Sequence, residues 1–369
     1  MMGLVRRLAT ALCVTALCGM TGCAGFWVYP GTASSTGTAG SDYVYVANAG
    51  AETISGFVVG TGTLTAISGT PTLSYAPTAM VVNTANSILY VASNSAIYAY
   101  SIGTGGVLSG GTVEITGVDV VSMNVSPDGQ WLFALDENAS TLYEYTITSS
   151  GLSVNTSGLL APESLAQTVA SSQAVKVAPD GKNVFVARGL EGDVVFPLTT
   201  STGALGTGVV LNPISTATSD NALTVDPTST YLYIARSGTN SGLAVYSITY
   251  SNGTPGLTQV GSTYSTGSVP YSVVMNAGGT DVYVANRSDG TISGYSVASG
   301  GALTSLGSAY SSGSGVDALA MDKSGSYLLA AALNGSSDLT MYSFSSGALV
   351  SQTTAVTGNS PIAIATTHP

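Results

Sequence analysis

From residue 42 to the end of the chain, short apolar segments alternate with polar turns. A stretch such as TISGYSV (291–297) alternates apolar and polar side chains, which is the period of a β-strand. Turns rich in Gly, Asn and Asp follow many of these stretches, as in SPDGQ (126–130) and APDGK (178–182). The pattern predicts many short antiparallel strands and disfavours helices.

One phrase recurs along the chain with a period in the forties. YVANAGAETISGF, which begins at Tyr45, aligns without a gap with YVANRSDGTISGY, which begins at Tyr283. Degraded copies lie between and after them. Their large anchor residues are Tyr45, Tyr90, Phe133, Phe185, Tyr233, Tyr283 and Leu329. A four-stranded unit of this length is typical of a propeller blade, so seven copies predict an all-β, seven-bladed β-propeller with four antiparallel strands per blade.

The two ends of the repeat region predict how the ring closes. An apolar strand precedes every anchor except the first, and the missing copy is PIAIATT (361–367) at the other end. We therefore expect the C-terminal strand to complete the first blade as its innermost strand. This closure leaves no open edge in the ring. Residues 42–369 are then one propeller domain.

The first segment has the character of an export signal. Arg6 and Arg7 precede an apolar run, which ends in Met20-Thr21-Gly22-Cys23 and resembles a bacterial lipobox. This predicts a signal peptide at 1–22, lipidation of Cys23, a Gly/Ser/Thr tether at 23–41 and an exported cell-envelope lipoprotein. An ordinary secretory cleavage is the alternative.

Composition excludes several classes of function. Charged residues are 7% of the chain and its net charge is −11, which argues against binding nucleic acid or docking electrostatically to anionic lipid. With one histidine, His368, and no cysteine after Cys23, we expect no metal site and no cofactor. A closed propeller needs no partner in order to fold, so we expect a monomer.

The words YVAN, SPDG and APDGKNVFVARG resemble the YVTN-type and lactonase-type seven-bladed propellers, whose namesakes include 6-phosphogluconolactonase. The resemblance implies lactone chemistry by arginine, histidine and an acid at a central cleft. Arg188-Gly189 fits the family pattern, and Asn286-Arg287 fits it in part. The family's histidine is missing. The loops entering the inner strands offer Gln173, Asp220, Tyr271 and Asp317 in its place.

One sequence column supplies the candidate site. The residue after each YVA-type triplet is expected to border one mouth of the channel, which would bring Asp136, Arg188, Arg236 and Asn286 side by side, with Arg287 next to them. These five are the predicted ligand-binding residues, because arginines can hold a carboxylate or phosphate by paired hydrogen bonds. In the alternative reading, each arginine fixes a loop by bonding a carbonyl or a carboxylate such as Glu191 or Asp193.

Two functions follow from these residues. The favoured hypothesis is a non-catalytic binding or scaffolding module of the cell envelope that meets a small anion, a sugar acid, a glycan or a partner protein. The alternative is a lactone hydrolase, similar to 6-phosphogluconolactonase, acting on a sugar lactone. In that alternative Arg188 or Arg236 would stabilise the oxyanion, and Asp136, Glu137 or Glu191 would act as the base.

Overall fold

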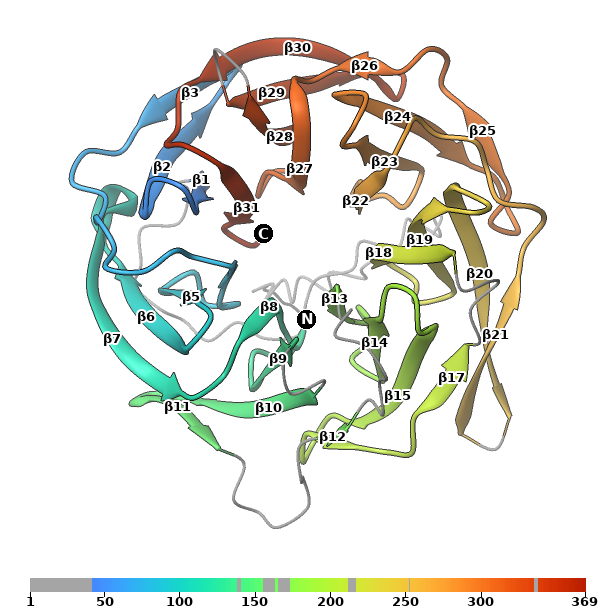
Figure 1. The fold of residues 1–369 in the computed structure, drawn as a ribbon, viewed down its shortest axis with the longest axis horizontal. Helices are drawn as coiled ribbons and strands as arrows, with labels where there is room; N and C mark the ends of the chain where they lie inside the picture. Colours follow the sequence, from blue (N-terminus) through green and yellow to red (C-terminus); the bar gives the residue numbers. More distant parts are fainter. Residues whose placement is uncertain are drawn as a thin grey trace, which may run out of the picture. The chain divides into compact units, whose positions relative to one another are not determined.

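The computed structural model describes residues 42–137, 141–154, 163–164, 173–211, 217–251, 253–334 and 338–369. Within these residues, seven antiparallel sheets surround a central channel and confirm the predicted seven-bladed propeller (Figure 1). The one helical element of the described chain is the short 3-10 turn η1 (Thr104–Gly106). No described helix has the length and apolarity to cross a membrane. The predicted signal peptide, Cys23 and the tether lie outside the described residues.

The innermost strand of each blade lines the channel. In order from blade 1 to blade 7, these strands are β31 (Pro361–Thr366), β4 (Ala79–Val82), β8 (Val120–Val125), β13 (Ala174–Val177), β18 (Thr218–Val225), β22 (Pro270–Met275) and β27 (Ser314–Met321).

The second strands carry the repeated phrase. They are β1 (Asp42–Asn48), β5 (Ile88–Ala92), β9 (Trp131–Asp136), β14 (Asn183–Ala187), β19 (Tyr231–Gly238), β23 (Asp281–Asn286) and β28 (Tyr327–Asn334). All seven anchor residues are fully buried in these strands. Burying such a side chain contributes roughly 1.5–3 kcal/mol relative to leaving it exposed, which explains why this position stays large in every copy.

The third and fourth strands complete each blade outward. The third strands are β2 (Thr53–Gly60), β6 (Ala96–Ile102), β10 (Thr141–Thr148), β15 (Asp193–Thr199), β20 (Gly242–Ser251), β24 (Thr291–Val297) and β29 (Leu339–Ser345). The fourth are β3 (Thr63–Ala66), β7 (Leu108–Thr116), β11 (Gly151–Val154), β16 (Ala204–Leu205), β21 (Thr254–Gln259), β25 (Leu303–Ser305) and β30 (Ala348–Ala355). Three short strands add to the third strands of blades 3, 4 and 6, namely β12 (Glu163–Ser164), β17 (Val209–Leu211) and β26 (Tyr310–Ser311).

The ring closes as the sequence predicts. β31 pairs antiparallel with β1, so the C-terminal strand is the innermost strand of blade 1. Beyond the ladder, the Thr367 hydroxyl accepts a hydrogen bond from the Tyr43 backbone N–H at 3.0 Å, which extends the closure to the end of the sheet.

Tyrosines of the repeated motif also form hydrogen bonds between neighbouring blades. The Tyr45 hydroxyl donates to the Gly106 carbonyl at 2.8 Å, and the Tyr283 hydroxyl donates to the Gly347 carbonyl at 2.6 Å. Each acceptor lies in the outer hairpin of the next blade. Gly106 has φ +77°, and a Cβ there would lie 2.7 Å from the Tyr43 ring, so this close approach requires glycine.

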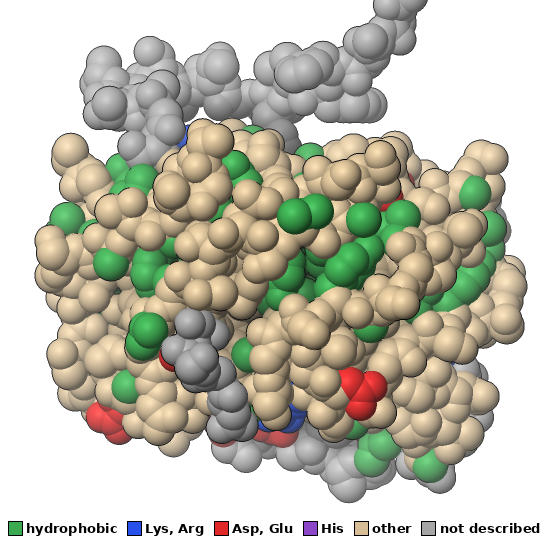
Figure 2. Space-filling model, turned by 90° about the horizontal axis from the view of Figure 1, so that it is seen from above, with side chains coloured by type: hydrophobic (Ala, Val, Ile, Leu, Met, Phe, Trp, Pro, Cys, Tyr) green, Lys and Arg blue, Asp and Glu red, His purple; other side chains and the backbone are tan. Residues whose placement is uncertain are grey.

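The outer surface carries few charged side chains, as the low charged-residue content of the chain leads us to expect. Seen edge-on, it consists mostly of uncharged side chains and backbone, with isolated acidic and basic groups (Figure 2). Charged side chains are therefore sparse on the face that Figure 2 shows.

Candidate functional site

The side chains at the ends of the second strands point into the blades. Each is at most 5% exposed, and they are Asn48, Ser93, Asp136, Arg188, Arg236, Asn286 and Ala332. Their expected position bordering the mouth therefore needs correction. A strand turns alternate residues to opposite sides, and this column faces the blade interior.

Arg188 holds its own loop. Its Nε donates to the Gly192 carbonyl at 2.5 Å, and its Nη2 donates to the Glu191 carbonyl at 2.8 Å. Burial lowers the pKa of Arg188, while the carboxylates of Asp193 and Glu191 act in the opposite direction. These contacts are the loop-fixing arrangement that the sequence offered as the alternative. As ligand-binding or catalytic residues, Arg188 and Glu191 stay predictions.

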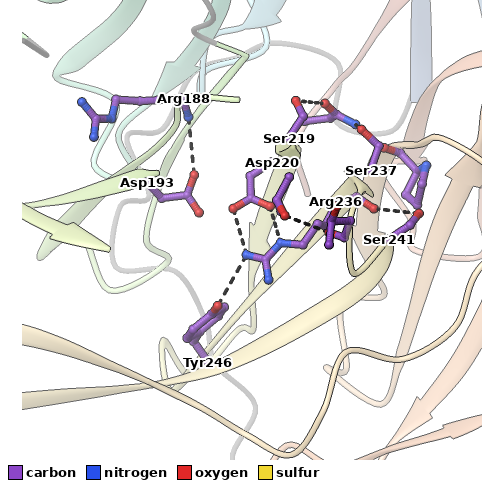
Figure 3. A network of polar contacts seen from close by, with 12 residues as sticks. Arg188, Asp193, Ser219, Asp220, Arg236, Ser237, Ser241 and Tyr246 are labelled. Carbon is purple, nitrogen blue, oxygen red and sulfur yellow. Dashed lines mark hydrogen bonds and ion pairs between the residues drawn. The ribbon is translucent and has the colours of Figure 1, made fainter. Parts of the chain in front are cut away.

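Arg236 forms a buried ion pair inside blade 5. Its Nε contacts Asp220 Oδ1 at 2.5 Å, and its Nη2 contacts Asp220 Oδ2 at 2.8 Å and the Tyr246 hydroxyl at 3.4 Å (Figure 3). Asp193 lies beside this pair. Burial raises its pKa well above the usual range, and the negative charge of Asp220 and a hydrogen bond between the two carboxyls add to the effect. The positive charge of Arg236 acts in the opposite direction on the pKa of Asp193.

Asn286 explains why YVAN and TISG occur together. Its Nδ2 donates to the hydroxyls of Thr291 and Ser293, both at 3.0 Å. In blade 1, Asn48 makes the same two bonds to the Thr and Ser of its own TIS. Asp136, in the equivalent position of blade 3, accepts a hydrogen bond from the Asp119 backbone N–H at 2.8 Å.

The cavity is instead lined by residues at the start of the inner strands. Five of these strands begin with a β-bulge, in which one extra residue escapes the ladder and is turned aside. The extra residues are Val121, Asn221, Tyr271, Asp317 and Ile362. All five line a cavity of about 570 Å³ in the channel, so the bulges aim these side chains at its axis.

Two further residues reach the cavity from the second strands. Glu137 and Arg287 each lie one position beyond the predicted column, and both line the cavity. Of the five predicted ligand-binding residues, Arg287 is therefore the one that the structure places there. Glu137, weighed as a base from the sequence, is also present.

Arg287 is the centre of the polar cluster in the cavity. Its Nε lies 2.5 Å from Asp317 Oδ1, and its guanidinium carbon lies 4.5 Å from the centroid of the Tyr271 ring. The Asp317 side chain is 4% exposed, whereas that of Arg287 is 39% exposed. The arginine is thus fixed by a buried carboxylate and an aromatic face, yet it stays open to a ligand.

The cavity perturbs its ionisable groups. Burial raises the pKa of Asp317 to about 6, although Arg287 opposes the shift. Burial also raises the pKa of Tyr271, and the carboxylates of Asp317 and Glu137 act in the same direction, against Arg287. At neutral pH the cluster around Arg287 therefore presents the Asp317 carboxylate, the Arg287 guanidinium and the neutral Tyr271 phenol. The described residues contain no cluster of three His, Cys, Asp or Glu side chains suited to a metal ion.

Comparison with known proteins agrees with this architecture. The model of the family "Lactonase, 7-bladed beta-propeller" matches residues 122–317 and 231–366. The chain belongs to this lactonase family. Among curated protein sequences, none matches it significantly.

Solved structures share the lactonase-family fold at low sequence identity. A protein from Lactobacillus plantarum is 17% identical, with a TM-score of 0.72, and covers 88% of this chain and 99% of its own. A Bacteroides fragilis protein provisionally assigned as a 6-phosphogluconolactonase is 15% identical, with a TM-score of 0.72 and coverages of 90% and 99%. The periplasmic gluconolactonase of Pseudomonas aeruginosa is 17% identical, with a TM-score of 0.67 and coverages of 89% and 99%. At these identities the likeness concerns the fold, and the chemistry rests on the residues of the cavity.

Of the residues that line the cavity of this lactonase-family propeller, the predicted ligand-binding set contained Arg287. Gln173, Tyr271 and Asp317 were noted only as the residues standing where the family often has histidine, and all three line the cavity. Asp220, the fourth of that set, instead pairs with Arg236. The available signal was the position of these residues at the entrance to an inner strand.

Proposed function

We propose that this lactonase-family protein is a binding module whose cavity takes a small, uncharged, polyhydroxylated ligand of the sugar-lactone class. The observation that carries the proposal is the placement of Arg287. Asp317 contacts its Nε and Nη2, so Nη1 is the guanidinium nitrogen left for a ligand. The cavity volume of about 570 Å³ suits a ligand of monosaccharide size.

The lining of the cavity favours a neutral polyol. Its uncharged polar groups include Ser122, Gln173, Asn221 and Ser272, which supply hydroxyl and amide partners for sugar hydroxyls. Its ionisable groups are one guanidinium and two carboxylates, a balance that repels an anion. A phosphorylated or carboxylated sugar is therefore expected to bind more weakly than its neutral counterpart.

A calorimetric titration tests the binding proposal. The probe is a gluconolactam, the stable nitrogen analogue of gluconolactone, because it does not hydrolyse during the measurement. We expect the neutral lactam to bind and its 6-phosphate to bind at least tenfold more weakly. Equal or tighter binding of the phosphorylated probe, or no binding of either, would contradict the proposal.

Lactone hydrolysis is the second candidate, favoured by the carboxylate and the guanidinium on the same cavity. The Asp317 or Glu137 carboxylate would take a proton from water while the water oxygen bonds to the lactone carbonyl carbon. Arg287 would stabilise the charge developing on the carbonyl oxygen. The ring C–O bond then breaks, and its oxygen receives the proton to give the hydroxy acid.

Proton release on addition of gluconolactone measures this reaction directly. If the protein is a hydrolase, wild type exceeds the spontaneous rate, and Asp317→Asn and Arg287→Met each reduce the enzymatic rate by at least about 10²-fold. A wild-type rate equal to the spontaneous rate would contradict the hydrolase hypothesis, and ligand binding would then be the one proposed function of the cavity.

Export and lipid anchoring form a separate part of the proposal, supported by the Arg6-Arg7 start and the MTGC sequence that ends at Cys23. We expect the wild-type protein to fractionate with membranes and its N-terminal peptide to carry lipid by mass spectrometry. Cys23→Ser should abolish lipidation and release the protein from the membrane. Unmodified Cys23 in the mature wild type would rule out the anchor.

A further inference from the structure

The seven inner strands present two different arcs to the cavity. The residue at the entrance of each inner strand lines the cavity in every blade. In blades 4 to 7 this residue is polar, namely Gln173, Asn221, Tyr271 and Asp317. In blades 1 to 3 it is Ile362, Thr78 and Val121, so two of the three are aliphatic. The wall of the cavity is therefore polar on one side and largely apolar on the other.

The cavity also extends deeper on the apolar side. Two residues farther along the inner strands of blades 1 to 3, its lining consists of Ile364, Met80 and Met123. These three positions are equivalent, because each pairs with the residue that follows the anchor of its own blade. The corresponding residues of blades 4 to 7 are buried in the core and lie outside the described lining, namely Val175, Leu223, Val273 and Leu319. We call the side chains of Ile362, Ile364, Met80, Val121 and Met123 the apolar arc.

The polar side chains next to the apolar arc already have partners within the protein. The Thr78 hydroxyl donates to the Val120 carbonyl at 2.5 Å, and Ser122 Oγ accepts the Val175 backbone N–H at 3.1 Å. The inner strands of blades 1 to 3 contain no charged residue. The five side chains of the apolar arc offer a ligand no charge and, apart from the weakly accepting thioethers, no hydrogen-bond partner.

Glu137 is the one charged residue that blades 1 to 3 contribute to the described lining. It immediately follows β9, whereas Met123 pairs with Ala134, three residues earlier along the chain. Three residues of an extended strand span roughly 10 Å. The Glu137 carboxylate therefore lies toward the mouth, and the deep residues of the apolar arc lie below it.

Arg287 lies across the channel from most of the apolar arc. It follows β23 of blade 6, and in a ring of seven blades the two opposite blade 6 are blades 2 and 3. Figure 1 shows β5 and β9, the second strands of blades 2 and 3, across the ring from β23. A ligand whose carbonyl contacts Arg287 therefore extends toward Met80, Val121 and Met123.

We propose that the apolar arc is a subsite for an apolar substituent of the ligand, an alkyl or aryl group attached to the neutral polyhydroxylated ring. This inference rests on the ligand class proposed above and adds an apolar part to that ligand. Covering apolar surface with an apolar group is favourable, and the unbranched side chains of Met80 and Met123 adapt to groups of different shape. Cavities of about 300–1,000 Å³ take drug-sized ligands. The volume of about 570 Å³ therefore leaves room for a substituent beside a sugar-sized ring.

Calorimetric titration with alkylated probes tests the subsite. The probes are gluconolactam and its 4-O-butyl and 6-O-butyl ethers, because these two oxygens project away from the carbonyl. We expect at least one butyl ether to bind wild type at least about tenfold more tightly than gluconolactam does, since each fully buried methylene is worth roughly fourfold in affinity.

Matched exchanges for threonine locate the effect. In the double variant Val121→Thr/Ile362→Thr, we expect the preference for the butyl ether over gluconolactam to fall at least about threefold, because the arc becomes more polar. Val350→Thr makes the same kind of exchange at a valine of β30 that is 44% exposed and outside the lining, and it should leave the preference unchanged. If the double variant fails to fold, Val121→Thr alone serves, since it keeps the shape of the side chain.

The possible results separate the subsite from the proposed ligand class. If gluconolactam binds wild type and neither butyl ether binds more tightly, the subsite is overturned and the ligand class stands. If the threonine variants retain the full preference for a butyl ether, the butyl group lies elsewhere and the subsite is again overturned. Absence of binding by all three probes would contradict both.

Discussion

Two arginine–aspartate pairs, one within blade 5 and one between blades 6 and 7, have opposite environments. Arg236 and Asp220 pair in register across β18 and β19, and their side chains are 2% and 4% exposed. Arg287 lies one residue beyond the end of β23, and Asp317 is the extra residue of a bulge in β27. The second pair lines the cavity, and its arginine is 39% exposed.

An offset of one residue on each strand separates these two pairs. In-register residues at the ends of the strands point into the blade, whereas the next residue along points to the channel. The same chemical pair is therefore buried within blade 5 in one case, and in the other it joins blades 6 and 7 as the polar centre of the cavity. Four experiments test this difference, in order of decreasing expected effect.

Breaking the buried pair should have the largest effect. Arg236→Met leaves Asp220 buried without its counter-charge, which costs about 3–5 kcal/mol of unfolding free energy. Urea denaturation monitored by circular dichroism measures the loss. The double variant Arg236→Met/Asp220→Asn should recover a large part of it. A loss below about 1 kcal/mol in the single variant would show that the pair is not a structural element.

The cavity pair should make stability depend on pH. Because the pKa of Asp317 is about 6 in the folded state, above its ordinary value, the folded protein holds this proton more tightly than the unfolded chain. The stabilisation is complete below about pH 4 and is lost as pH rises through 6, by up to roughly 3 kcal/mol. Melting temperatures between pH 4 and 8 should fall accordingly, and Asp317→Asn should flatten the curve. Asp42, with a pKa of about 7, extends the decline to higher pH.

Asn48 and Asn286 test the structural role of the residues that follow each YVA-type triplet. Asn48→Ala and Asn286→Ala each remove two hydrogen bonds to hydroxyls, which is expected to cost about 1–2 kcal/mol. The losses should be similar because the contacts are the same in both blades. If Asn286→Ala keeps full stability but loses ligand binding, the column contacts the ligand after all.

Removing the cavity arginine should change stability least. At pH 5 Asp317 is mostly protonated and tolerates the loss of its partner, so Arg287→Met should change the unfolding free energy by less than about 1 kcal/mol. Chemical denaturation at pH 5 checks this, with Arg236→Met as the comparison. A loss as large as that of Arg236→Met would place Arg287 among the structural residues.

The sequence predicted the fold more completely than the site. Seven anchors, their spacing and the PIAIATT strand were enough to assign the blades and the closure, because burial repeats in every copy. Which residues line the cavity depends on where each inner strand has a β-bulge. The local sequence around Tyr271 and Asp317 contains no signal that predicts a bulge. The column that contains Arg188 and Asn286 was therefore chosen one residue away from the side chains that line the cavity.

The most direct test of this account is calorimetric titration of gluconolactam into wild type, Arg287→Met and Lys182→Met. Lys182 is the matched control, since its loss removes one positive charge at an exposed pair that is not part of the cavity lining. The account predicts that Lys182→Met binds as wild type does, within about twofold, and that Arg287→Met loses at least about tenfold in affinity, or roughly 1.4 kcal/mol. Unchanged affinity in Arg287→Met would contradict the claim that the offset pair, rather than the buried column, forms the binding site.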